Sequence, residues 1–229
     1  DSGASRGLVD VDKRKNRIMY IYVVWLSFAI SLIIYYLFKL NIKNERLNRL
    51  ENVLNSMDLT RKWLPGYNVD CLTGERVKNK STTVSSSHCS CFVFALCNKM
   101  NVKMIGTPEY KQYHLATNQM KWLRTNEAKE CGWREINGNL KEKYITSQKK
   151  ANDGYLVIAG VEQDNEIKGH IAIVRPSNKL EFYVVREGPE VMSSSTINTY
   201  SSSIKEDFLY YQKNMKDFEN RTRFYYNIK

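Results

Sequence analysis

One uncharged stretch near the N-terminus constrains this chain more than any other feature. The stretch runs from Ile18 to Phe38 and contains no charged residue, no proline and no glycine. At 1.5 Å per residue, a helix over it is about 30 Å long, which matches the hydrocarbon core of a bilayer. Tyrosines lie near both ends, where aromatic side chains favour the headgroup region. The stretch therefore predicts a single transmembrane helix over residues 18–38, with the lipid bilayer as a partner.

Two other interpretations of this stretch fit less well. A buried helix of this length in a soluble domain would show a polar face. A cleaved signal peptide has a shorter apolar region that ends at small residues, and residues 39–42 offer no such site. Lysine and arginine are slightly more frequent before the stretch than after it, which favours an N-terminus on the cytoplasmic or matrix side. The C-terminal domain is then expected across the membrane.

The rest of the chain suffices for one domain. We expect a polar N-terminal tail at residues 1–17, an amphipathic helical linker at residues 39–62 and a globular domain at residues 63–229. The formal net charge of +11 favours acidic partners such as lipid headgroups or cell-wall polymer. Because the charges are dispersed and no nucleic-acid motif is present, nucleic acid is not an expected partner.

An apolar stripe in the linker requires something to pack against. It consists of Leu47, Leu50, Leu54 and Met57, at helical spacing. The segment is too short to form a stable coiled coil by itself. The globular domain, a second copy of the chain and another membrane subunit are the alternatives.

The domain is expected to be α+β. Helices are predicted over residues 91–100 and 118–125, and strands over residues 155–161, 170–174, 180–185 and 223–228. The polar segment 69–87 and the serine-rich runs at residues 193–195 and 201–203 are typical of loops. An early helix packed on a small antiparallel sheet is the expected arrangement.

The chain has five cysteines and three histidines. No CxxC pair is present, and Cys89 and Cys91 are too close in sequence for a zinc ribbon, so neither a metal nor a cofactor is expected. The odd number leaves at least one thiol free. A disulfide between Cys71 and Cys131 is expected if the domain faces an oxidising compartment.

Cys89 and His170 form the candidate catalytic pair. Cys89 lies where an apolar helix should begin, near unpaired backbone N–H groups that stabilise a thiolate. His170 opens a predicted strand after Gly169 and can accept and return a proton. On spacing alone, a cysteine of the hydrophobic core is the simpler interpretation.

Several runs of residues resemble motifs of the NlpC-type and CHAP-type cysteine peptidases and amidases, which cut peptidoglycan stem peptides. Residues 88–93 (HCSCFV) look like their CSxFV signature. Residues 169–174 (GHIAIV) are similar to their second motif, and residues 151–159 to the strand before it. Residues 118–123 and Gly132-Trp133 also fit the amidase effectors of type VI secretion. The similarity covers residues 85–226 and excludes the anchor.

The resemblance implies a papain-like domain in which Cys89 is the nucleophile, His170 is the general base and the Cys89 N–H helps to hold the oxyanion. Cys91 is the alternative nucleophile if the helix starts differently. Relatives orient the imidazole with a polar side chain on the strand after the histidine. The matching residue here is Ser193, which is short for this role, so Glu190 or Glu187 is expected to replace it.

Two functions follow as hypotheses. The first is a membrane-anchored cysteine amidase or endopeptidase that hydrolyses amide bonds of peptidoglycan stem peptides. The second is a catalytically inactive, amidase-like accessory subunit of a larger membrane complex, with the stripe of the linker as its contact. A toxin or effector with its own anchor would share the chemistry of the first and differ in its target.

Overall fold

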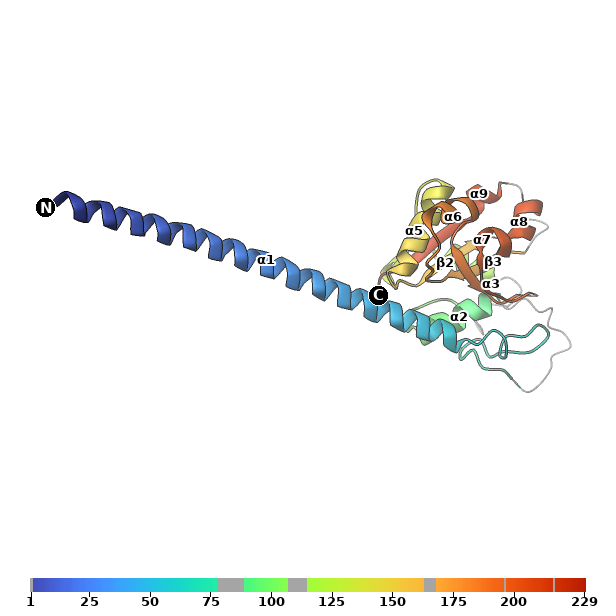
Figure 1. Cartoon of the computed structure of the whole chain (residues 1–229). Coiled ribbons are helices and arrows are strands. Elements are labelled where there is room, and N and C mark those ends of the chain that lie inside the picture. The colour runs from blue at the N-terminus through green and yellow to red at the C-terminus, as the bar shows by residue number, and fades with distance from the viewer. Residues whose placement is uncertain (1, 78–88, 107–114, 163–167, 196, 216) are drawn as a thin grey trace. The chain divides into compact units, whose positions relative to one another are not determined.

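A computed structural model describes the chain except residues 1, 78–88, 107–114, 163–167, 196 and 216, and of residues 2–16 and 18 it describes the backbone alone (Figure 1). The chain divides into two compact units, residues 1–44 and residues 45–229. His88, the serines before it and His114 lie outside the described residues. Most of segment 69–87, expected as a loop, also lies outside them.

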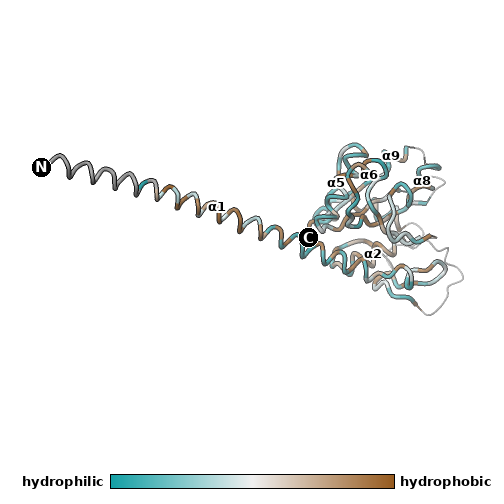
Figure 2. Tube along the Cα trace, in the orientation of Figure 1, coloured by the Kyte–Doolittle hydropathy of each residue, from teal (hydrophilic) through white to brown (hydrophobic). Residues whose placement is uncertain are grey.

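The first unit is helical throughout its described length. Helix α1 (Ser2–Ser56) begins at Ser2, within the segment expected as a polar N-terminal tail. Figure 2 shows hydrophobic residues along its middle part, and the large side chains of residues 19–38 are exposed. Within the described residues, α1 is the one helix long and apolar enough to cross a membrane. It is consistent with a single-pass membrane protein, and its length and composition also fit a signal sequence.

The end of α1 belongs to the second unit. Leu50, Leu54 and Met57 are buried in the core of that unit, and Leu47 is half-buried. A Cβ atom at Gly154 would lie 2.4 Å from the backbone nitrogen of Leu47, so only glycine allows this approach. The globular domain therefore covers the stripe, and its buried side chains are not accessible to another subunit.

An antiparallel sheet of six strands forms the centre of the second unit (Figure 1). In chain order the strands are β1 (Trp133–Glu135), β2 (Val157–Val161), β3 (His170–Val174), β4 (Glu190–Ser193), β5 (Thr199–Ser203) and β6 (Arg223–Asn227). Their order in the sheet is β1-β6-β2-β3-β4-β5. All residues of β2 and β3 are buried, because helices cover both faces.

One face of the sheet packs against the end of α1 and against α2 (Cys89–Lys99), α3 (Leu115–Trp122) and α4 (Asn126–Glu130). The other face packs against α5 (Leu140–Asn152), α6 (Glu181–Glu187), α7 (Ile204–Asp207), α8 (Leu209–Asn214) and α9 (Phe218–Arg221). Alternation along β3 divides its side chains between the faces: Ile171 and Ile173 join the first core, and Ala172 and Val174 join the second.

The mixed α and β architecture with an antiparallel sheet agrees with the sequence. The strands predicted at residues 155–161, 170–174 and 223–228 are confirmed as β2, β3 and β6. The helices predicted at residues 91–100 and 118–125 are present as α2 and α3, and each begins earlier than expected.

Two local predictions are wrong. Residues 180–185 form helix α6 rather than a strand, although they are aromatic and β-branched. Leu180 and Phe182 are both 67% exposed, and Val184 is buried. The helix therefore needs only the side chain of Val184 to pack against the core. The other error concerns the serine-rich runs expected as loops: Ser193 is the last residue of β4, and residues 201–203 form part of β5.

Candidate active site

The thiol of Cys89 meets the imidazole of His170. Cys89 is the first residue of α2, and His170 is the first residue of β3. The two side chains share a hydrogen bond. Both residues are almost completely buried, with exposed fractions of 2% and 3%. The fold thus brings together the two residues that the sequence singled out.

Asp207 extends this pair to a chain of three groups. Its Oδ2 atom lies 3.0 Å from Nε2 of His170, and its side chain is 3% exposed. Because Nε2 faces the carboxylate, Nδ1 is the ring nitrogen left for the thiol. A carboxylate in this position fixes both the tautomer and the orientation of the imidazole.

Ser193 contacts Asp207 and not the imidazole of His170. Its Oγ atom donates a hydrogen bond of 2.8 Å to Oδ1 of Asp207. Thr199 also hydrogen-bonds this carboxylate through its side chain. Ser193, which the sequence resemblance placed at the orienting position, therefore contacts the carboxylate of Asp207 rather than the imidazole.

Glu190 does not contact His170, contrary to the prediction. It hydrogen-bonds Ser201, and Glu187 pairs with Lys179 and Arg186. The register explains the difference: Val191 of β4 pairs with Val174, so Glu190 lies beyond the far end of β3 from His170. At about 3.3 Å per residue, the length of β3 separates the two side chains.

The charged forms of His170 and Asp207 stabilise each other. Burial alone lowers the pKa of His170, but the charge and hydrogen bond of Asp207, together with Cys89, raise it to about 10. Burial raises the pKa of Asp207, and its interactions with His170, Thr199 and Ser193 outweigh this and lower it. At neutral pH the site therefore holds an imidazolium and a carboxylate, and a neighbouring imidazolium stabilises a thiolate.

Aromatic rings cover the imidazole. The ring of Tyr211 stacks on that of His170 with centroids 5.2 Å apart and an interplanar angle of 8°. Phe208 meets the same imidazole edge-on at 4.7 Å. Burial raises the pKa of Tyr211, and the charges of Cys89 and Asp207 raise it further, so its phenol stays protonated. These rings keep water from the ion pair, which strengthens it.

The disulfide pairing differs from the prediction. Cys71 pairs with Cys91 across a sequence separation of 20, and Cys131 is free. Cys91 is therefore not an alternative nucleophile, because its sulfur is in the disulfide. The bridge ties the segment around Cys71 to the helix that carries Cys89.

Sequence reasoning missed Asp207. It lies in a short acidic run with Glu206, and several other acidic residues follow His170, so no local signal singles it out. Gln119 was also missed: its Nε2 atom donates to the backbone oxygens of Ser90 (3.0 Å) and Ile105 (3.1 Å), which fixes the start of α2. Among the described residues, no three metal-ligating side chains gather.

Comparison with known protein families finds no family that matches the chain, and comparison with curated protein sequences finds no relative.

Proposed function

We propose that this protein is a membrane-anchored cysteine amidase or endopeptidase with a papain-like catalytic domain, acting on amide bonds of peptidoglycan stem peptides. The observation that carries the proposal is the buried chain of contacts from Cys89 through His170 to Asp207. A thiol at the first residue of a core helix and an imidazole on an antiparallel strand support a papain-like arrangement.

The chemistry follows from these three groups. The Cys89 thiolate attacks the carbonyl carbon of the amide, and the His170 imidazolium gives its proton to the departing amine. This leaves a thioester on Cys89. Water then attacks the thioester while His170 takes up its proton, which releases the carboxylic acid product and restores the Cys89 thiolate beside the His170 imidazolium. Asp207 keeps the imidazole in place throughout.

The proposed location has two supports. The apolar part of α1 holds the domain near a membrane, and the net charge of +11 suits an acidic cell-wall polymer. The Cys71–Cys91 disulfide is typical of an oxidising compartment, which favours a domain on the far side of the membrane from the cytoplasm or matrix.

The test uses the full chain in detergent micelles with purified peptidoglycan fragments, and mass spectrometry identifies the products. We expect Cys89→Ala to lower the rate by about a thousandfold or more, because the covalent step is lost. Cys131→Ala is the matched control, since that cysteine is also free but lies outside the site. Equal product from the wild-type protein and Cys89→Ala would refute the proposal.

One observation favours the second function, a non-catalytic accessory subunit. Cys89 and His170 are 2% and 3% exposed, and Tyr211 stacks on the imidazole, so a substrate reaches the thiol only if a covering group moves. Two sequence features that suit this function, the short side chain of Ser193 and the apolar stripe of the linker, have another explanation in the structure. Asp207 supplies the missing orienting group, and the domain itself covers the stripe at the end of α1.

A thiol-reactive probe distinguishes the two functions. In an enzyme, Cys89 should react faster than Cys97 and Cys131, and its rate should persist at acidic pH because the imidazolium maintains the thiolate. Ordinary labelling of Cys89, together with purification in a stoichiometric complex, would favour the accessory subunit.

A further inference from the structure

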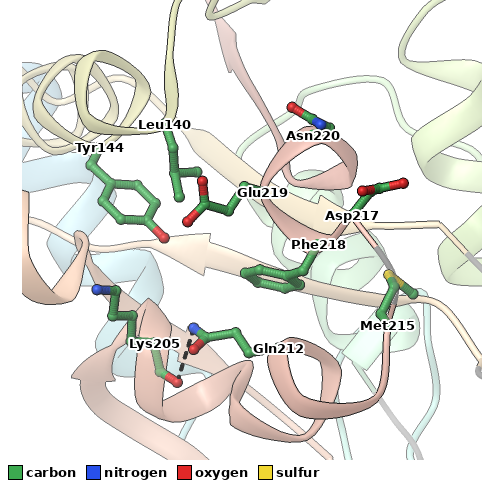
Figure 3. A pocket seen from close by; sticks show the side chains of 9 residues that line it. All are labelled: Leu140, Tyr144, Lys205, Gln212, Met215, Asp217, Phe218, Glu219 and Asn220. Atoms are coloured by element: carbon green, nitrogen blue, oxygen red, sulfur yellow. Dashed lines mark hydrogen bonds between the residues drawn. The ribbon is translucent and has the colours of Figure 1, made fainter.

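A pocket lies among α5, α7, α8 and α9, on the face of the sheet opposite α2 (Figure 3). Its volume is about 510 Å³, which is in the range of small-molecule sites. Met215 and Phe218 give it apolar walls, and polar side chains reach it from α5, α7, α8 and α9. None of the groups of the candidate active site lines it.

Tyr144 brings an unpaired polar group to this pocket. The residue is 1% exposed, and its hydroxyl has no hydrogen-bond partner among the described residues. Figure 3 shows the hydroxyl directed into the pocket, toward Glu219. The ring packs edge-on against Phe224 at 5.8 Å, which holds the hydroxyl in this direction. A buried hydroxyl without a partner is destabilising, so a ligand that supplies one is favoured.

Opposite charges stand on the two sides of the pocket. Figure 3 shows Lys205 and Gln212 across the pocket from Glu219. Neither Lys205 nor Glu219 forms an ion pair with any described residue. Gln212 donates to the backbone oxygen of Lys205 at 3.3 Å, which links α8 to α7. The pocket thus offers a cation and an anion to one small ligand.

We propose that this pocket binds a free α-amino acid. The carboxylate of the ligand pairs with the Lys205 ammonium, and its ammonium pairs with the Glu219 carboxylate and donates to the Tyr144 hydroxyl oxygen. The ligand's side chain lies against Phe218 and Met215. Asp217 adds a second negative charge to the lining, so a basic amino acid such as lysine is preferred.

The pocket adjoins the candidate active site through two short connections. Helix α7 carries Lys205 to the pocket and Asp207 to His170. The ring of Phe208 touches that of His170 and lies 6.3 Å from that of Phe218. Binding requires no thiol chemistry, however, so this inference is independent of the proposed amidase activity.

Isothermal titration calorimetry tests the inference on the full chain in detergent micelles, in the Cys89→Ala background to exclude turnover. L-Lysine should bind saturably, and N-acetyl-L-lysinamide, which lacks both α-charges, should bind at least about tenfold more weakly. Lys205→Met and Glu219→Gln should each weaken L-lysine binding about tenfold, and Tyr144→Phe should weaken it several-fold.

Lys213→Met is the matched control, because Lys213 is an exposed lysine of α8 that does not line the pocket. It should leave L-lysine binding unchanged, and circular dichroism should give the same spectrum for every variant. Absence of saturable heat with L-lysine, equal binding of the blocked lysine, or binding that survives all three pocket substitutions would each overturn the inference.

Discussion

The Oδ2 atom of Asp207 lies 3.0 Å from Nε2 of His170, although 37 residues separate them in the chain. Helix α6 and strands β4 and β5 lie between them in the chain. Asp207 is the last residue of α7, and it contacts the first residue of β3. The pairing gives His170 a carboxylate partner that lies within the same buried cluster as the Cys89 thiol. Several measurable consequences depend on it.

Asp207→Asn should reduce catalysis strongly. The amide keeps the shape but removes the charge that stabilises the imidazolium, so kcat should fall by about a hundredfold to ten-thousandfold. The measurement is the initial rate of amide cleavage as a function of pH. Because the pKa of His170 should fall, the alkaline limb of the profile should move to lower pH.

Ser193→Ala provides the graded comparison for that variant. It removes one hydrogen bond to Asp207 and leaves the charge, so the rate should fall only about tenfold. A loss as large as that of Asp207→Asn would show that Ser193 has a direct part in the reaction.

The stability of the fold should depend on pH through the same pair. The pKa of His170 is raised from 6.5 to about 10, so its contribution is complete below about pH 6.5 and is lost as the pH rises toward 10. The pKa of Asp207 is lowered from 3.8, so its contribution is complete above about pH 4 and is lost at more acidic pH. Urea unfolding should therefore separate the wild-type protein from Asp207→Asn most between about pH 4 and 6.5. A difference that grows between pH 7 and 10 contradicts this assignment.

The Cys71–Cys91 disulfide should stabilise the domain. For a closed loop of 20 residues, its loss costs about 3 kcal/mol in the free energy of unfolding. The Cys71→Ser/Cys91→Ser double variant should show this decrease in chemical denaturation. Cys131→Ser is the control and should change little. A cross-linked peptide that contains Cys71 and Cys131 in a non-reducing digest would exclude the observed pairing.

The end of α1 should be essential for the stability of the domain. Leu54 is 1% exposed within the core, so Leu54→Ala should lower the free energy of unfolding by about 2–5 kcal/mol. Asn48→Ala, on the exposed side of the same helix, should stay within about 0.5 kcal/mol of the wild-type protein. Similar small effects of both substitutions would show that this helix does not pack against the domain.

The sequence alone identified the features that depend on local patterns. The uncharged stretch from Ile18 to Phe38 indicated the long apolar helix, because hydropathy acts residue by residue. The short apolar run at residues 170–174 predicted β3 with its correct bounds, since a strand buried on both faces is apolar throughout. Cys89 and His170 stood out because each begins such an apolar element.

The tertiary structure decided which distant residues meet. Asp207 was not identifiable among several acidic residues, and Cys91 rather than Cys131 pairs with Cys71. Likewise, residues 180–185 have the composition of a strand and form α6, because packing overrides a weak local preference. Such choices depend on the register of β3 with β4 and on the return of α7 to the sheet, which are long-range contacts that no local pattern records.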